Sequence, residues 1–398
     1  MNDLSVARVS TVKFFIFTQL GSQLESIRAS GANLTVITSD DDNLVDDSVD
    51  FDKFNFIPVH IPRNINLLAD FRALLALVRV FKANKFDIVH STTPKAGLLC
   101  AIAGKIAGIK VRLHTFTGQP WATKSGPEQL ILKWCDKIIG HLNTRCYADS
   151  FSQKKFLVDS HIMPNYKLHV LGEGSLAGVD LQRFNPCRYK KEDNDRLKAE
   201  LDVPQSSFII LFVGRVTREK GVFELIQAFS EIINRGVDAY LVFVGPFEID
   251  AQQCLDSLKG NNVMQRMRIV GFSREPEKYM SISDVLCLPS YREGFGTVVI
   301  EAAAMGVPTI GTDIYGLSDA VVNGETGILV PVRDYKALAL AMTSLAVDAT
   351  LRAEMGINAR KRVLDKFDSR TMGHLLMQEY KNLMADFTLS GGLEGENL

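Results

Sequence analysis

The sequence predicts an α/β protein made of two doubly wound, parallel-sheet domains in tandem. Its 398 residues exceed the length, about 250–300 residues, at which a single hydrophobic core stops growing. Short β-branched and aromatic runs alternate with amphipathic stretches along the chain, as in successive βαβ units. The composition, 46% hydrophobic and 23% charged, excludes a disordered or a fibrous protein.

The first half of the chain contains six predicted strands: VKFFIF, NLTVIT, FNFIPVH, DIVHS, VRLHT and RCYADS. The clearest helix between them covers residues 67–83, where apolar residues recur at helical spacing. This stripe consists of Leu67, Leu68, Phe71, Leu74, Leu75, Val78 and Phe81. We interpret it as core packing, with a membrane anchor as the alternative.

The second half repeats the pattern after a highly charged stretch, residues 188–200, that predicts a linker and a helix. Its predicted strands are FIILFVG, AYLVFVG, RIVGF, VLCLPS, VPTIGT and TGILVP. Residues 350–387 contain helical patterns and no further strand. We therefore expect one domain over residues 1–180 and a second over 181–373, with a final helix, 374–390, that packs back on the first domain.

Charge is distributed unevenly, although the net charge is only −1. Residues 95–155 contain ten basic and three acidic residues, interleaved with Phe116, Trp121, Leu130, Ile131 and Trp134. Such a cationic and aromatic face could meet an anionic membrane surface or a phosphorylated acceptor, and a solvated face beside core residues is the alternative.

The absence of a membrane-spanning run or signal peptide and the pattern of cysteines predict a cytoplasmic protein. No apolar run reaches the 18 or so residues that span a bilayer, and residues 1–12 lack the apolar core of a signal peptide. The six cysteines are scattered without a CxxC pair, so we expect small buried residues and no metal site or disulfide framework.

Two loops that follow predicted strands carry the chemistry, because ligands of open parallel sheets bind at the carboxyl ends of the strands. RVTREKG places Arg215 and Lys220 after one strand, where two cations suit phosphate oxygens. SYREGFGTVVIEAAAMGVP places Glu293 in a loop and Glu301 inside the following helix, at most ~12 Å apart. The two carboxylates could accept hydrogen bonds from ribose and sugar hydroxyls while the N–H groups of Gly294 to Thr297 face phosphates; solvent-exposed charges are the alternative.

The segments GRVTREKG, SYREGFGTVVIEAAAMGVP and NGETGILVP, in this order, resemble the carboxyl-terminal domain of retaining glycosyltransferases of family 4. FDIVHSTTPKAG and GVDLQRFNP extend the resemblance over nearly the whole chain. It implies a GT-B fold, in which two Rossmann-like domains face a cleft, and sugar transfer from a nucleotide diphosphate sugar without a metal or other cofactor.

The resemblance also implies roles for individual residues. Arg215 and Lys220 would bind the donor diphosphate, Glu293 the transferred sugar and Glu301 the ribose. Further donor contacts would come from Gly271 and Phe272, next to the base, and from Gly294, Phe295, Gly296 and Thr297.

His114, which closes the strand VRLHT, would lie near the donor sugar and polarise or position a hydroxyl group. The leaving phosphate itself would take the acceptor proton in a front-face reaction. A structural histidine is the alternative, since a lone histidine at a strand end more often packs than reacts.

The segment FTQLGSQLES departs from relatives that have two glycines after the first strand, and it leaves Gly21 as the amino-terminal donor contact. Relatives with this shortened form often act on lipid-linked sugars. The implied partners are a UDP-hexose or UDP-N-acetylhexosamine donor, a polyprenyl-diphosphate-linked glycan and the inner membrane surface, with no nucleic acid.

Four other interpretations remain open. Gly21 with Asp40 is a poor match to the fingerprint of a nicotinamide-dependent oxidoreductase. Asp40, Asp41 and Asp42 could form a metal-binding acidic motif, but they are more simply a solvated loop. A non-hydrolysing nucleotide-sugar epimerase and a non-catalytic donor-binding partner would share the two-domain architecture.

Overall fold

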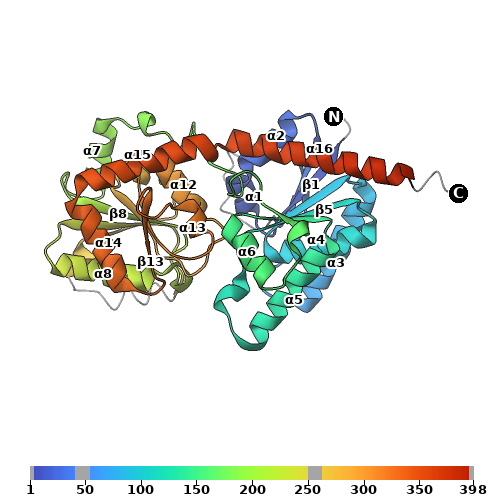
Figure 1. The fold of residues 1–398 in the computed structure, drawn as a ribbon, viewed down its shortest axis with the longest axis horizontal. Coiled ribbons are helices and arrows are strands. Elements are labelled where there is room, and N and C mark those ends of the chain that lie inside the picture. Colours follow the sequence, from blue (N-terminus) through green and yellow to red (C-terminus); the bar gives the residue numbers. More distant parts are fainter. Residues whose placement is uncertain (1–3, 41–53, 250–261, 394–398) are drawn as a thin grey trace. The chain divides into compact units, whose positions relative to one another are not determined.

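The computed structural model describes residues 4–40, 54–249 and 262–393. The chain divides into two compact units, unit 1 with Met1–Gly178 and Ser369–Leu398, and unit 2 with Val179–Asp368 (Figure 1). The sequence placed these boundaries at residues 180 and 373. Each unit is a parallel sheet covered by helices, which confirms the α/β class and the two Rossmann-like domains. No helix in the described ranges is long and apolar enough to cross a membrane.

Unit 1 is built on a seven-stranded parallel sheet with the order β3-β2-β1-β4-β5-β6-β7. Its strands are β1 (Ser5–Val9), β2 (Asn33–Thr38), β3 (Asn55–Pro58), β4 (Ile88–Thr92), β5 (Val111–Phe116), β6 (Arg145–Ala148) and β7 (Leu168–His169). The chain winds outward from β1 to β3 and then outward again from β4 to β7. This reversal of direction defines a doubly wound sheet.

The prediction for the first strand is wrong. VKFFIF belongs to helix α1 (Lys13–Gln19), and the first strand is the preceding segment SVARV. SVARV contains Arg8, a charged residue that interrupts the apolar run, yet its side chain is fully buried. Its guanidinium donates hydrogen bonds to Gln23 Oε1 (3.0 Å) and to the hydroxyl of Tyr380 (3.3 Å). These partners are distant in sequence, so the strand has no local signal.

The helices of unit 1 are α1, α2 (Gly21–Ala29), α3 (Leu67–Asn84), α4 (Pro94–Ala107), α5 (Gly126–Leu142), α6 (Phe151–Asp159) and the last helix, α16 (Ser369–Leu393). Helix α3 confirms the predicted helix, and the Asn66 side chain caps its start by accepting from Ala69 N (3.1 Å).

The interpretation of the α3 stripe as core is wrong for its first half. Leu67, Leu68 and Phe71 are more than half exposed, and Leu75 is also exposed. The buried face of α3 instead consists of Ala73, Leu77 and Phe81, spaced four residues apart. The spacing therefore predicts the helix, but the exposed apolar residues give it a second apolar face.

Helix α16 packs on unit 1, as predicted for the last helix, but it begins at Ser369 and not at residue 374. Leu376, Met377, Tyr380 and Leu383 join the same buried cluster as residues of α1, α2 and the first strands. The Tyr380 hydroxyl lies 2.7 Å from His90 Nδ1 on β4. Unit 1 therefore needs a segment that follows unit 2 in the sequence.

Unit 2 contains a six-stranded parallel sheet with the order β10-β9-β8-β11-β12-β13. Its strands are β8 (Phe208–Val213), β9 (Ala239–Val244), β10 (Met267–Gly271), β11 (Val285–Leu288), β12 (Thr309–Thr312) and β13 (Gly327–Val330), and all six were predicted. Its helices are α7 (Lys191–Glu200), α8 (Val222–Asn234), α10 (Asn262–Gln265), α11 (Pro276–Met280), α12 (Thr297–Ala304), α13 (Leu317–Ala320), α14 (Tyr335–Val347) and α15 (Ala349–Lys366).

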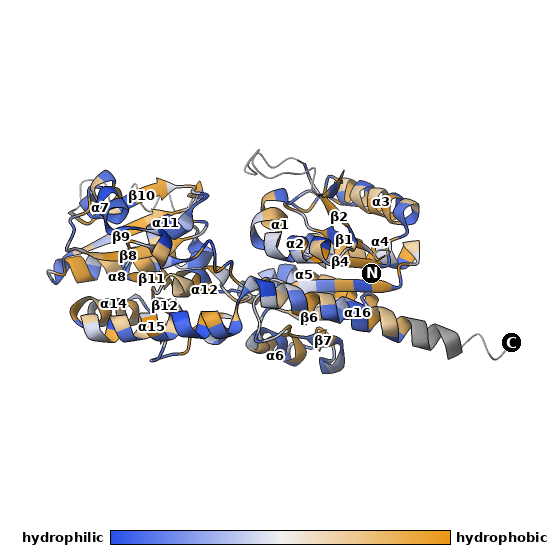
Figure 2. Cartoon of the chain, turned by 90° about the horizontal axis from the view of Figure 1, so that it is seen from above, coloured by the Kyte–Doolittle hydropathy of each residue, from blue (hydrophilic) through white to orange (hydrophobic). Residues whose placement is uncertain are grey.

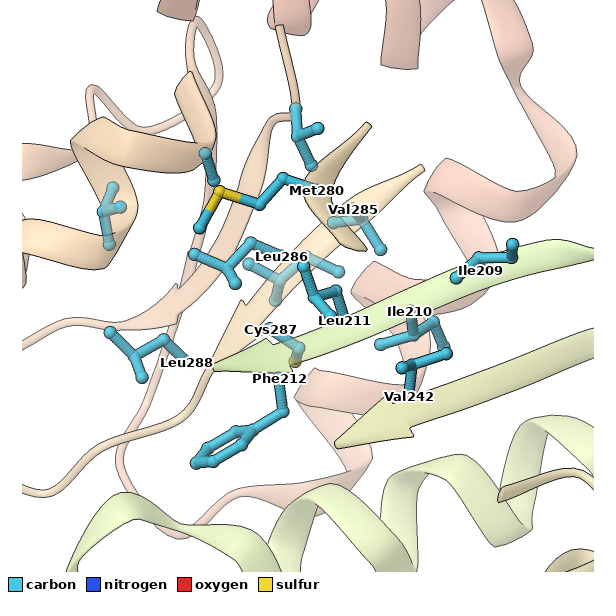
Figure 3. Close-up of a cluster of buried hydrophobic side chains, with 14 of the residues drawn as sticks. Ile209, Ile210, Leu211, Phe212, Val242, Met280, Val285, Leu286, Cys287 and Leu288 are labelled. Carbon is cyan, nitrogen blue, oxygen red and sulfur yellow. The ribbon is translucent and has the colours of Figure 1, made fainter. Parts of the chain in front are cut away.

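The core of unit 2 lies on both faces of this sheet. Figure 3 shows Phe212 of β8 close to Cys287 of β11, and both are fully buried. In Figure 2 the central strands are mostly coloured as hydrophobic, whereas the surrounding helices are mixed. Strands that are buried on both faces appear in the sequence as continuous apolar runs, which explains why β8, β9 and β11 could be predicted.

The cysteines follow the prediction only in part. Cys100, Cys146 and Cys287 are buried, Cys135 is half-buried and Cys187 is exposed. Burial raises the pKa of the Cys146 thiol to about 12, so this thiol stays protonated. The sixth, Cys254, lies outside the described residues.

Candidate functional site

The candidate site of unit 2 lies where the strand order reverses. β8 pairs with β9 on one side and with β11 on the other, so the loops that follow β8 and β11 leave the sheet side by side. This switch point is where open α/β sheets bind ligands. The two loops are RVTREKG and SYREGFG, the same two in which the donor-binding residues are predicted.

Close backbone contacts hold the two loops together. Tyr291 N donates a hydrogen bond to Glu219 O (2.9 Å), and the Arg292 guanidinium forms an ion pair with the Glu219 carboxylate (2.8 Å). Gly221 has φ +70°, and a Cβ on it would lie 1.9 Å from Pro289 O. Only glycine allows this approach, so the position of Lys220 is fixed against the neighbouring loop.

Lys220 and Glu293 meet at this point. Lys220 Nζ lies 2.5 Å from Glu293 Oε1, and the Ser290 hydroxyl donates to the same oxygen (2.8 Å). Both charged side chains are partly buried, with exposed fractions of 25% and 13%. A half-buried ion pair at a strand switch point provides a cation and a carboxylate that an incoming polar ligand can engage.

Arg215, the second predicted cation, does not share this contact. Its guanidinium pairs with Glu248 across 2.6 Å, and both side chains are largely exposed. Arg215 follows β8 directly, so it leaves the same end of the sheet as Lys220. An exposed ion pair contributes little to stability, so Arg215 can change partner at small cost.

The loop after β11 leads into helix α12 through a tight turn. Gly296 has φ +83°, and Gly316 lies so close that a Cβ on it would be 2.6 Å from Gly294 O. The Phe295 side chain is buried, with its ring centroid 5.3 Å from that of Phe367. Phe295 therefore anchors the turn, while Thr297 begins α12, where Val299 N donates to the carbonyl of Gly296 (2.8 Å).

Glu301 lies on α12, within a cluster of charges. Burial raises the pKa of the Glu301 carboxyl to about 7; the positive charge of Arg183 opposes this shift and the negative charge of Glu277 adds to it. Arg183 donates to both carboxylate oxygens of Glu277, each at 2.8 Å. Arg183 is not among the predicted site residues, although it lies in the segment GVDLQRFNP.

Gly271 and Phe272 lie at the end of β10. Gly271 has φ +77° and accepts a hydrogen bond at its carbonyl from Gly245 N (2.7 Å), and Phe272 is 38% exposed. β9 separates β10 from β8, so these residues leave the sheet two strands away from Lys220.

His114 lies on β5 in unit 1 and is only 1% exposed. Its Nδ1 is 3.0 Å from the Ser91 hydroxyl, and its ring contacts Phe116 edge-on. Burial lowers its pKa to about 3, so the imidazole is neutral at physiological pH. This packing fits the structural alternative, and the role with a sugar hydroxyl stays a prediction.

The basis for selecting Gly21 is wrong. Gly21 is the first residue of α2 and not part of the loop after the first strand, because that strand ends at Val9. The match to a nicotinamide-binding fingerprint loses its glycine turn for the same reason. Asp40 forms an ion pair with Lys13 (2.6 Å), while Asp41 and Asp42 lie outside the described residues.

The large apolar residues of the basic segment 95–155 have two different environments. Phe116 and Trp121 are buried in the core, so they do not form part of a surface as predicted. Leu130, Ile131 and Trp134 are each more than half exposed.

Comparisons with known proteins agree with this architecture. Residues 193–362 match the family Glycosyl transferases group 1, and residues 18–174 match the Glycosyl transferase 4-like domain. The capsular polysaccharide biosynthesis glycosyltransferase CapM of Staphylococcus aureus is 33% identical over 92% of this chain and 93% of its own length.

Two further proteins extend the comparison. The UDP-Gal:alpha-D-GlcNAc-diphosphoundecaprenol alpha-1,3-galactosyltransferase of Escherichia coli is 28% identical over 81% of both chains. The solved structure of sucrose-phosphate synthase from Thermosynechococcus elongatus aligns with a TM-score of 0.80 at 23% identity, over 96% of this chain and 100% of the other. This likeness supports the GT-B fold.

Proposed function

Because the chain belongs to the group 1 glycosyl transferases, we propose that it transfers a hexose or N-acetylhexosamine from a UDP-linked donor to a polyprenyl-diphosphate-linked glycan. The capsular and diphosphoundecaprenol-directed relatives support an acceptor of this class in surface polysaccharide synthesis. The name of the second relative also supports a UDP-linked donor.

The ion pair of Lys220 with Glu293 at the strand switch point of unit 2 carries the proposal. A nucleotide diphosphate sugar presents phosphate oxygens next to sugar hydroxyls. Lys220 can donate to the phosphate oxygens, and Glu293 can accept from the sugar hydroxyls. The bound nucleotide sugar would therefore replace the contact between Lys220 and Glu293 with one contact to each of them. Arg215 would exchange Glu248 for the same diphosphate.

The chemistry follows from this placement. The bond between the sugar C1 and the diphosphate oxygen breaks, and a bond forms between C1 and the acceptor oxygen on the same face. The departing phosphate oxygen takes the acceptor proton. Lys220 and Arg215 would stabilise the negative charge that grows on the diphosphate, which is the largest contribution in reactions of this type. The reaction would need no metal ion and retain the anomeric configuration.

Glu301 and the end of β10 would hold the nucleoside. The Glu301 carboxylate would accept hydrogen bonds from the ribose hydroxyls, with Gly271 and Phe272 beside the base. The pKa of Glu301 is about 7, so this carboxyl is only partly ionised near neutral pH. Ribose binding would favour the ionised form and lower the pKa.

The experiment that tests the function incubates the protein with a panel of UDP-sugars and an undecaprenyl-diphosphate-linked sugar, in the presence of EDTA. We expect transfer from at least one UDP-sugar, and the product's anomeric coupling by NMR should match that of the donor. A panel of nucleotide sugars in a thermal-shift assay would identify the donor, because a ligand that binds only the native state raises the melting temperature.

The matched variants are Lys220→Ala and Lys336→Ala, since Lys336 is an exposed lysine on α14. Only Lys220→Ala should lose transfer. Conversion of the UDP-sugar to its epimer without an acceptor, or donor binding without any turnover, would contradict the proposal.

A further inference from the structure

A tyrosine of the loop after β11 contacts the segment after β8 without belonging to the proposed donor contacts. The Tyr291 hydroxyl donates to both carboxylate oxygens of Glu224, at 2.7 and 2.8 Å. Glu224 lies in the first turn of α8, which follows Lys220, and Tyr291 lies two residues before Glu293. The contact therefore joins the two segments that carry the candidate ion pair.

Both the side chain and the backbone of Tyr291 are held by the neighbouring segment. Burial raises the pKa of Tyr291 to about 12, and the hydrogen bond to Glu224 adds to the shift. The hydroxyl therefore stays protonated and remains a donor at physiological pH. Its acceptor is charged, which strengthens the hydrogen bond. In addition, Tyr291 N donates to Glu219 O (2.9 Å).

A third loop reaches Tyr291 from the edge of the sheet. Arg333 follows β13, which β12 separates from β11, and its guanidinium lies 4.7 Å from the centre of the Tyr291 ring. This distance is within the range of a cation–π contact. Tyr291 is thus held at its hydroxyl by one loop and at its ring by another.

Arg333 makes this contact from a backbone conformation that is unfavourable for it. Its φ is +63°, and among the described residues of unit 2 only Asp202 shares a positive φ without being glycine. Asp202 directly follows the end of α7, where this conformation is common. Arg333 instead precedes α14, where no helix end accounts for it. Non-glycine residues kept in this region cluster at functional sites.

These contacts matter when the donor binds. The donor would remove the contact between Lys220 and Glu293, and the two loops would then lose one of the links between them. Loops that gain freedom on binding lower the affinity, because that freedom must be lost again to form the complex. The contacts of Tyr291 involve no donor-binding group, so they can persist and keep the loops in place.

We propose that Tyr291 and Arg333 are positioning residues of the donor site. They hold the loop 290–296 against α8 while the donor takes the place of the contact between Lys220 and Glu293. Both act through these two residues, and neither needs to touch the donor. The inference rests on the proposed function for the class of the ligand, a nucleotide diphosphate.

The test measures the binding of UDP by titration calorimetry to the unaltered full chain and to Tyr291→Phe, Arg333→Gly and Asp202→Gly. We expect the dissociation constant of UDP to rise about tenfold in Tyr291→Phe, which loses a hydrogen bond to a charged group. Arg333→Gly should show a rise of similar size. Asp202→Gly is the matched control, because Asp202 is also exposed with a positive φ, and it should bind UDP like the unaltered protein.

The melting temperature separates positioning from a general loss of stability. Glycine adopts a φ of +63° without strain, so the melting temperature of Arg333→Gly should match that of Asp202→Gly. A loss of UDP affinity in Arg333→Gly alone is then not explained by a weaker fold. Arg333→Lys keeps a cation that can contact the ring and should retain most of the affinity for UDP.

Hydrogen exchange tests the inference without a ligand. The Tyr291 amide is bonded to Glu219 O, so its exchange reports whether the two segments stay together. We expect residues 290–296 to exchange faster in Tyr291→Phe and in Arg333→Gly than in the unaltered protein. Addition of UDP to the unaltered protein should not speed this exchange, because the loop stays in place. Faster exchange with UDP bound would overturn the inference.

The remaining outcomes distinguish this inference from the proposed function. Unchanged exchange in both variants would overturn the inference, whether or not UDP binds. So would equal UDP affinity in all four chains, or equal losses in Arg333→Gly and Asp202→Gly. Neither measurement needs turnover, so a protein that shows the expected effects but transfers no sugar contradicts only the proposed function.

Discussion

The two units share the order of their first six strands but carry different chemistry at the carboxyl ends of those strands. In unit 2 this end holds charged groups, with Lys220 against Glu293 and Arg215 in the same loop as Lys220. In unit 1 it holds neutral groups, because burial lowers the pKa of His114 to about 3 and raises that of Asp149 well above its usual range. One topology thus offers a charged surface suited to a diphosphate and a neutral one suited to hydroxyl groups.

The contrast teaches that the strand order fixes where a ligand binds, and the loop residues fix which ligand binds. A change to the charged end should therefore affect turnover strongly. A change to the neutral end should act mainly through packing.

The largest expected effect comes from Lys220→Ala, which removes the central cation of unit 2. We expect kcat to fall about 10²–10³-fold, the loss typical of one preorganised group that stabilises transition-state charge. Circular dichroism should show an unchanged fold, because the ion pair is partly exposed. Steady-state rates with saturating donor measure the effect, and activity within threefold of the unaltered protein would remove the distinction between the two units.

The next effect concerns the backbone that supports Lys220. Gly221→Ala places a Cβ 1.9 Å from Pro289 O at a residue with φ +70°. We expect a loss of about 1–3 kcal/mol in the free energy of unfolding, since both strain and overlap must be relieved. Urea denaturation measures it. Gly108→Ala provides the control, because Gly108 has a similar φ (+75°) but nothing within 4 Å of its Cβ position.

The third effect is a pH dependence of UDP binding by unit 2. The pKa of Glu301 is raised from 4.5 to about 7, so its contribution to stability is fully present below pH 4.5 and is lost as the pH rises through 7. If the ionised carboxylate binds ribose, UDP affinity should rise roughly tenfold between pH 6 and pH 8. Titration calorimetry of the unaltered protein and of Glu301→Gln measures this. A pH-dependent affinity that persists in Glu301→Gln would assign the titration to another group.

The smallest effect tests the neutral end in unit 1. A Cβ on Gly97 would lie 2.4 Å from His114 Cε1, at a residue with ordinary helical geometry. Gly97→Ala should cost about 1 kcal/mol of stability, because the ring can shift to relieve the overlap. The transfer rate should fall less than in Lys220→Ala. A loss of activity as large as that of Lys220→Ala would give His114 the direct part that its burial argues against.

The comparison also shows what a sequence can predict. The strands β8, β9 and β11 of unit 2 appear as apolar runs, because almost every residue in them is buried in a parallel sheet. In unit 1 the short strand β1 includes Arg8, whose partners Gln23 and Tyr380 are brought near only by the fold. Since these partners cannot be inferred from the sequence, the aromatic run VKFFIF gives the stronger strand signal. This error also puts Gly21 in the loop after the first strand, whereas it begins α2.

The candidate site could be predicted only in part from the sequence, for a similar reason. The positions of Lys220, Glu293 and Glu301 after β8 and β11 followed from motif spacing. Arg183 could not be found this way, because its contact with Glu277 joins residues 94 positions apart. The exposure of the first half of α3 could not be predicted either, since helical periodicity identifies an apolar face but not what covers it.

Helix α16 has a consequence for how the protein is made. Leu376, Met377, Tyr380 and Leu383 belong to the core of unit 1, yet they leave the ribosome after all of unit 2. In a nascent chain, unit 2 can therefore fold while the apolar surface of α2 that α16 later covers is still exposed. We expect ribosome-bound chains that stop before Ser369 to recruit chaperones, and a stop codon at that point to yield an aggregating product.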